Sequence, residues 1–121
     1  MAKITIAQQF CGPPNSGNGG YVCGVLAKDI DGPATSVLRA RVPLDVDLEL
    51  NTDAGVVTMT DAEGGLVGRG ETADRDLLPT PPAPPSLEAA RAAAGRYIGL
   101  VQRVHPTCFS CGPERHEGDG L

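Results

Sequence analysis

Tryptophan is absent from this chain, and aromatic residues make up only 3% of its 121 residues. A hydrophobic core must therefore be built mainly from Val, Leu, Ile and Ala. Long apolar runs are absent as well, because none approaches the roughly 18 residues that a membrane-spanning helix needs. The opening stretch, MAKITIAQQF, has one lysine and no long apolar region, unlike a secretory signal peptide. We therefore expect a cytoplasmic protein with no membrane partner.

Positive charge is also scarce. The chain has 10 Lys and Arg against 15 Asp and Glu, which gives a net charge of −5 and a pI near 4.8. Without a basic run, neither nucleic acid nor an anionic membrane surface is expected as a main partner. A small anionic ligand stays compatible with this composition, since a local site can still offer backbone N–H groups.

The remaining composition is that of an ordinary globular protein, with 40% hydrophobic residues in a length that suits one domain. The four cysteines are expected to be reduced thiols, because the chain shows no export signal. Cys11 and Cys23 are interpreted as small core residues.

Residues 17–29 are predicted to form a helix. Ser16 is a suitable N-cap, and Gly32 is expected to end the segment. The stretch GGYVCGVLA carries no charged residue before Lys28. A helix that is apolar all round is expected to be buried on most of its sides.

Strands are predicted from alternating hydrophobicity. An extended segment at 4–10 precedes the helix, and strands are expected at 35–42, 44–50, 56–61 and 66–72. The segment LDVDLEL alternates most regularly, with the following side chains expected to face inward: Leu44, Val46, Leu48 and Leu50. Tight turns join the later strands, which favours an antiparallel meander with one solvated face.

The second half of the chain has a different character. Residues 77–85 are rich in proline and are predicted to be a stiff linker. Residues 86–101 are predicted to form a connector helix, with Ser86 as its N-cap. Residues 102–121 show no clear period, so they are either an unstructured tail or the start of a second unit. With residues 1–76 as the folded unit, the predicted class is α+β.

A strand, an apolar helix and a four-strand meander, in this order, resemble the hotdog fold, in which an antiparallel sheet curls round a central helix. The stretch GNGGYVCGVLA (17–27) is similar to the HGGY motif and small apolar helix of double-hotdog acyl-CoA thioesterases. The terminal stretch CFSCGPERHEGDGL is similar to the start of many hotdog thioesterase domains. The resemblance implies a first hotdog unit at 1–76, a connector and the opening of a second unit.

The same resemblance implies a thioester-binding site at the start of the helix. Gly17, Gly19 and Gly20 lie at or before its first turn, where backbone N–H groups are free and no side chain blocks a ligand. The carbonyl of an acyl-CoA thioester would be polarised by these donors. The alternative is that the glycines only let the helix and the sheet pack closely.

Thioesterases of this kind use a carboxylate or a polar substitute near the helix to activate water. Here the helix has no acid before Asp29, and Asn18 replaces the usual histidine. Asn15, Asn18 and Tyr21 are candidates for orienting water or the thioester, but none is a general base. Hydrolysis of acyl-CoA by a homodimer with a continuous sheet is one expectation. A non-catalytic half that serves dimerisation and acyl binding is the alternative.

A third possibility comes from the terminal cysteines and histidines. His105, Cys108, Cys111 and His116 offer the ligand types of a structural zinc site, and thus of a zinc-binding interaction module. A redox Cys-x2-Cys pair is disfavoured, because the strand–helix unit that usually flanks one is missing. A packing or flexible segment is the remaining interpretation. Apart from this zinc hypothesis, no cofactor is expected.

Overall fold

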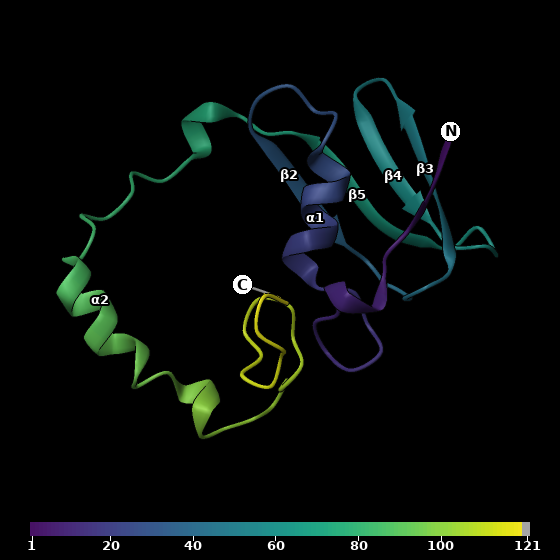
Figure 1. The fold of residues 1–121 in the computed structure, drawn as a ribbon. Coiled ribbons are helices and arrows are strands. Elements are labelled where there is room, and N and C mark those ends of the chain that lie inside the picture. Colours follow the sequence, from purple (N-terminus) through teal and green to yellow (C-terminus); the bar gives the residue numbers. More distant parts are fainter. Residues whose placement is uncertain (120–121) are drawn as a thin grey trace.

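A computed structural model of the chain describes residues 1–119, except for the side chain of Leu77, and has an α+β architecture (Figure 1). A five-stranded antiparallel sheet packs against helix α1 (Gly19–Ala27), and a long connector leads to a C-terminal segment that returns to the start of this helix. The predicted α+β class is confirmed.

The strands of the sheet are β1 (Ala2–Thr5), β2 (Ala34–Leu38), β3 (Asp47–Asp53), β4 (Val56–Thr60) and β5 (Leu66–Thr72). Their order is β1-β3-β4-β5-β2, and every pairing is antiparallel. β3, β4 and β5 form a meander, but the predicted four-strand meander is wrong for β2, which pairs with β5 instead of β3, the next strand in the chain. β1 and β2 are the two edges, and helix α1 lies between them in the chain, so the helix segment carries the chain from one edge to the other.

Alternation along β3 determines which face of the sheet is covered. Leu48 is fully buried and Leu50 partly buried, while Glu49 between them is exposed. Leu50 pairs with Met59 of β4, which is also fully buried. The other buried core residues come from the helix, the sheet and the loops between them: Ile6, Val22, Leu26, Val42, Val57 and Val67.

The predicted bounds of the segments at 4–10 and 44–50 are wrong. β3 begins at Asp47 instead of residue 44, so Val46 lies outside the strand and is 47% exposed rather than inward. The left-handed backbone of Asp45 (φ 56°) turns the chain just before the strand. The extended segment predicted at 4–10 is β1 followed by a 3₁₀ turn, η1 (Gln8–Phe10).

β2 is shorter than the strand predicted at 35–42. It ends at Leu38, because the amides of Arg39 and Ala40 both donate to the carbonyl of Val67 and the ladder cannot continue in register. The chain then leaves the sheet and returns through Val42, whose side chain is 1% exposed.

Helix α1 is also shorter than predicted, and its N-cap is Asn18 instead of Ser16. The expectation that most of its sides are buried is wrong. Val22 and Leu26 are buried, but Gly20 and Gly24 are exposed on the opposite side. The reason is that strands β2, β4 and β5 cover one side of the helix, and the side away from the sheet is open.

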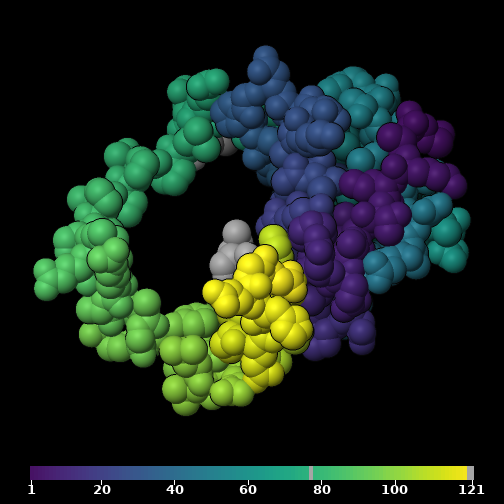
Figure 2. Space-filling view, in the orientation of Figure 1, coloured from purple at the N-terminus to yellow at the C-terminus, as the bar shows by residue number. Residues whose placement is uncertain are grey.

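The connector stands off the sheet and α1 (Figure 2). It contains η2 (Arg75–Leu77), helix α2 (Leu87–Ala94) and η3 (Ile98–Leu100). Ser86 caps α2 as predicted, with its Oγ accepting from the Ala89 amide at 3.1 Å. The predicted helix at 86–101 is too long, because α2 ends at Ala94, with Gly95 as its C-cap, and none of its residues is buried to hold a further turn. Within residues 1–119, no helix is long and apolar enough to cross a membrane.

Candidate functional site

The side chain of Asn18 lies at the centre of the candidate site. It is 8% exposed, and its Oδ1 accepts a hydrogen bond from the Tyr21 amide at 3.0 Å, which caps helix α1. Its Nδ2 donates to Ser110 Oγ at 3.0 Å and to Cys108 Sγ at 3.6 Å. These two residues belong to the C-terminal segment 105–119, here called the tail. Asn18 therefore joins the start of α1 to the tail.

Arg115 is the second anchor of the tail, with a side chain that is 9% exposed. Its guanidinium donates to the carbonyl oxygens of Gln9 and Thr107, both at 2.7 Å, and to Asp119 Oδ1 at 2.6 Å. It also lies 5.6 Å from the centroid of the Phe109 ring. Five N–H donors in a rigid fork allow this one side chain to hold several oxygens at once.

An aromatic cluster completes the contact between the tail and the start of α1. The rings of Phe10 and Tyr21 stack with centroids 4.0 Å apart, and Phe109 meets them edge-on at 5.1 and 6.1 Å. The Phe109 amide donates to the carbonyl of Cys11 at 2.7 Å. Tyr21, predicted to orient water or the thioester, thus lies beside Asn18 with its ring packed among other aromatics.

Asn15, the third predicted catalytic residue, lies apart from these contacts. It is an exposed turn residue in the left-handed region (φ 57°). It lines a cavity of about 500 Å³ that is also lined by Arg41, Asp61 and Glu63. The structure brings Asn18 and Tyr21 together and does not bring Asn15 to them.

The three glycines predicted to bind a ligand have different surroundings. A Cβ built on Gly17 would lie 3.1 Å from side-chain atoms of Val22 and Val42, so a side chain at Gly17 would crowd these two valines. A Cβ on Gly19 or Gly20 would meet other atoms only at 3.7 and 3.4 Å, which is ordinary contact. Within residues 1–119, their amides donate no hydrogen bond, as is usual in the first turn of a helix. Close packing therefore explains Gly17 and leaves Gly19 and Gly20 unexplained.

Cys108 and Cys111 face each other within the tail. Their Sγ atoms are 2.8 Å apart, with Cys111 as the donor. Burial by itself raises the pKa of the Cys108 thiol. Hydrogen bonds outweigh this effect and lower the pKa to about 7. They come from the Cys111 thiol, from the backbone and side chain of Ser110 and from the backbone of Cys111. The pKa of Cys111 is raised, because its proton is held in the hydrogen bond to Cys108. Burial raises the pKa of Cys23, which suits an unreactive helix residue.

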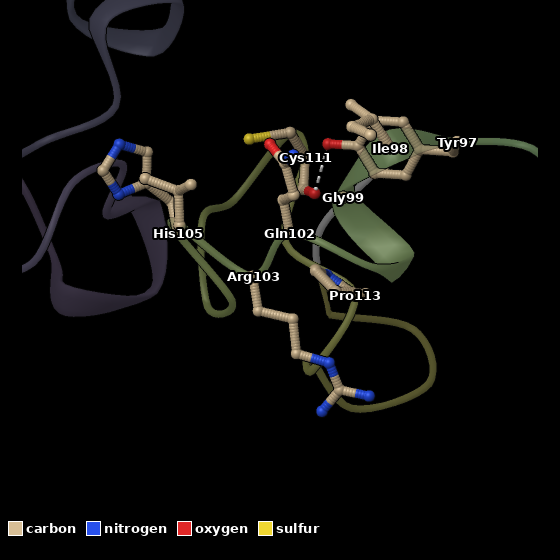
Figure 3. Close-up of a pocket in the computed structure, with 9 residues that line it drawn as sticks. Tyr97, Ile98, Gly99, Gln102, Arg103, His105, Cys111 and Pro113 are labelled. Carbon is tan, nitrogen blue, oxygen red and sulfur yellow. Dashed lines mark hydrogen bonds between the residues drawn. The ribbon is translucent and has the colours of Figure 1, made fainter.

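Cys111 lines a cavity of about 190 Å³ at the end of the connector (Figure 3). Tyr97 also lines this cavity, and its hydroxyl donates to the neighbouring Cys111 carbonyl at 2.9 Å. His105 and Arg103 also line this space, and the buried Nδ1 of His105 has no hydrogen-bond partner in the described part of the chain. The cavity thus gives access to the exposed thiol of the cysteine pair.

The predicted zinc ligands do not come together. Among residues 1–119, no group of three or more His, Cys, Asp or Glu side chains is arranged to hold a metal ion. Cys108 and Cys111 are in contact, but His105 and His116 do not join them. His116 lines a different cavity with Gln8 and Arg115, because the chain turns away after Cys111. The spacing is compatible with zinc, but the tail does not place the four side chains around one point.

Sequence reasoning missed Arg115, Phe109 and Ser110, the residues that hold the tail against the start of α1. The sequence does contain one indication of the two segments that meet: the tripeptide Cys-Gly-Pro occurs twice, at 11–13 and at 111–113. In both copies the glycine lies where a side chain would clash. A Cβ on Gly12 would be 3.0 Å from the Asn18 Cα, and one on Gly112 would be 2.4 Å from the Cys108 amide nitrogen. The repeated tripeptide therefore marks two tight turns in the segments that meet.

Comparisons of the chain with models of protein families, with curated proteins and with solved structures found no match in any of the three. Functional assignment therefore depends on the fold, on the geometry around Asn18 and on the motifs of the sequence. Of these, Gly19 and Gly20 bear most directly on ligand binding, because packing does not require them and, within residues 1–119, their amides donate no hydrogen bond.

Proposed function

We propose that residues 1–76 form a hotdog-type unit that binds acyl thioesters, such as acyl-CoA, at the start of helix α1. The observation that carries this proposal concerns Gly19 and Gly20. Within residues 1–119 their amides donate no hydrogen bond, and a Cβ at either position would make only ordinary contacts. Two adjacent N–H donors at a helix N-terminus suit a thioester carbonyl oxygen, on which negative charge develops when water attacks.

The arrangement of the sheet supports a hotdog-type unit. The only α-helix among residues 1–76, α1, follows β1 and packs across β2, β4 and β5, as the sequence resemblance leads one to expect. The sheet is a single antiparallel layer with one face on the helix. The other side of α1, with Gly20 and Gly24, is exposed and is available to a second copy or to the acyl chain.

Binding without self-sufficient hydrolysis is favoured by the surroundings of Asn18. Both polar ends of its amide are occupied by Tyr21, Ser110 and Cys108, and within residues 1–119 it has no hydrogen bond to a carboxylate. A side chain that is fixed in this way cannot activate water as a general base. A non-catalytic unit that binds the acyl thioester is therefore the second candidate function.

The test is binding and turnover with a panel of acyl-CoA thioesters of short to long chain, with free CoA as the reference ligand. We expect acyl-CoA to bind more tightly than free CoA. Gly19→Ala and Gly20→Ala should weaken that preference by about two- to tenfold, the value of one poorly made hydrogen bond, without loss of folding. Gly95→Ala, at the end of α2 in the connector, is the control outside the proposed site, since nothing lies within 4 Å of its Cβ position.

Two outcomes would contradict the proposal. In the first, acyl-CoA and free CoA bind equally well. In the second, Gly19→Ala and Gly20→Ala bind acyl-CoA as tightly as the parent protein and the control variant do. Release of free thiol from acyl-CoA separates the two candidates. Turnover by the purified chain supports a thioesterase, and binding without turnover supports the non-catalytic unit.

A further inference from the structure

The geometry of the tail points to a redox-active dithiol: we propose that Cys108 and Cys111 form a reversible disulfide by exchange with low-molecular-weight thiols and disulfides such as glutathione. This inference does not depend on acyl-thioester binding. It is carried by the placement of the two sulfur atoms, by their unequal exposure and by the turn that holds them.

The two sulfur atoms are already close to bonding distance. They are 2.8 Å apart, and a disulfide bond measures about 2.05 Å, so closure requires a movement of less than about 1 Å. Both cysteines are free thiols in the structure. The two-residue spacing, Phe109-Ser110, is that of Cys-x2-Cys redox motifs.

Gly112 explains why this pair is held so tightly. Its amide donates to the Cys108 carbonyl at 2.8 Å and closes the turn. A Cβ at this position would lie 2.4 Å from both the Cys108 nitrogen and the Pro106 carbonyl oxygen. Only glycine lets the chain fold back so closely, and this return brings Cys111 Sγ onto Cys108 Sγ.

The two thiols have different access to solvent, and this difference gives each a role. Cys111 is exposed and lines cavities of about 190 and 380 Å³, so a small disulfide can reach its sulfur. Cys108 is 4% exposed, and its sulfur is near donors from Asn18 and Ser110. A thiolate held by hydrogen bonds is a good leaving group, so a disulfide that involves Cys108 is easily reduced again.

The exchange proceeds in two balanced steps. Cys111 passes its proton to the Cys108 thiolate across the hydrogen bond between them, and the resulting Cys111 thiolate attacks one sulfur of a disulfide RSSR. The S–S bond of RSSR breaks, and one RS⁻ leaves and takes up the proton that Cys108 received. The Cys108 thiolate then attacks Cys111 Sγ, the mixed disulfide breaks, and the second RS⁻ leaves and takes up a proton. The two cysteines lose two electrons and two protons, and RSSR becomes two RSH. Reduction runs in reverse, with an external thiolate attacking the accessible Cys111 sulfur.

The first experiment equilibrates the whole chain in glutathione buffers of increasing oxidised fraction, followed by acid quenching, alkylation of remaining thiols and peptide mass mapping. We expect two of the four thiols to be lost together as a Cys108–Cys111 disulfide, and to return when the buffer is made reducing. Retention of all four thiols in fully oxidised glutathione would overturn the proposal. So would a disulfide that instead links Cys11 or Cys23, or two molecules.

Single variants test the assigned roles. Cys108→Ser should accumulate a glutathione adduct on Cys111, because no second thiol resolves it, whereas Cys111→Ser should form no adduct on buried Cys108. Cys23→Ser is the matched control and should behave like the parent protein. The absence of an adduct in Cys108→Ser, or an adduct on Cys108 in Cys111→Ser, would contradict the order of attack.

Two glycine variants provide a second test that keeps both cysteines, in case the substitution of Cys108 disturbs the tail. Gly112→Ala retains all four thiols but cannot keep the turn, so the fraction of disulfide in a given glutathione buffer should fall well below that of the parent chain. Gly95→Ala, where nothing lies within 4 Å of the Cβ position, should change nothing. Equal disulfide formation in Gly112→Ala and in the parent chain would show that the turn does not hold the pair.

Discussion

The thiol of Cys108 is buried and yet surrounded by hydrogen-bond donors, and its pKa is lowered from 9.0 to about 7. The groups that face the pair are Asn18, Ser110 and Tyr97. In the unfolded chain the donors are gone and the thiol regains its ordinary pKa. The thiolate interactions therefore stabilise the fold fully above about pH 9, and this stabilisation is lost as the pH falls from 9 through 7. The raised pKa of Cys111 has the opposite effect, because it lowers the stability of the fold as the pH rises, but this effect acts only above pH 9.

We therefore predict that the free energy of unfolding of the parent chain, relative to Cys108→Ala, increases between pH 7 and pH 9. The measurement is urea denaturation of both proteins under reducing conditions at several pH values, with thiolate ultraviolet absorbance followed in parallel. The absorbance should show one thiolate appearing near pH 7 in the parent chain. A stability difference that does not change with pH would show that the donors around Cys108 do not stabilise its charge.

The N-cap of helix α1 shows the limit of a prediction that uses only neighbouring residues, because the sequence offers both Ser16 and Asn18 for this position. Both residue types cap helices well, so the sequence near residue 17 permits either start. The structure selects Asn18, because Gly17 is held outside the helix by an antiparallel bridge with Cys11 and by its amide hydrogen bond to the carbonyl of Val42. That partner lies far along the chain, and no local signal announces it.

At the scale of elements, helix α1 approaches β5 most closely over Gly70. A Cβ on Gly70 would lie 2.9 Å from the Leu26 carbonyl oxygen and 3.2 Å from its Cβ. Because the helix backbone has little freedom to yield, Gly70→Ala should lower the free energy of unfolding by about 1–3 kcal/mol, as overpacking does. Gly24→Ala, on the open side of the same helix, should raise it by about 0.5–1 kcal/mol through helix propensity.

Urea denaturation of the two variants beside the parent chain measures both changes. The opposite signs make the pair informative, since each variant adds one methyl group to the same helix–sheet unit. If Gly70→Ala were as stable as the parent chain, the helix and the sheet would have to be less closely packed than the distances indicate.

Elements differ in how far the sequence predicts them. β5 was predicted at its observed bounds, 66–72, because a glycine turn precedes it and its pattern is regular. The docking of the tail could not be predicted. Arg115 holds carbonyl oxygens of Gln9 and Thr107, and the Phe109 amide holds that of Cys11. Every residue carries such backbone groups, so these contacts leave no trace in side-chain pattern.

For the whole molecule, the order of the strands leaves β1 and β2 as the edges of the sheet, and the two differ in how well they are protected against pairing with another sheet. β1 carries Lys3, whose ammonium pairs with Asp47 at 3.4 Å, and a lysine on an edge discourages pairing with another sheet. β2, with the sequence ATSVL, has no charged residue and pairs with β5 alone among the described strands. An uncharged, unpaired edge next to the open side of α1 is the surface through which two copies can join their sheets.

We therefore predict a homodimer that forms through β2 and is weakened by Val37→Lys. Val37 is 39% exposed, so the lysine can be accommodated in the monomer while its charge opposes burial at a strand–strand contact. Val104→Lys is the matched control, because Val104 is 69% exposed in the stretch that follows η3, which lies outside the sheet. Sedimentation of the three proteins over a range of concentrations should show dimers of the parent chain and of Val104→Lys, and monomers of Val37→Lys at the lower concentrations. A parent chain that stays monomeric throughout would rule out a site shared between two copies.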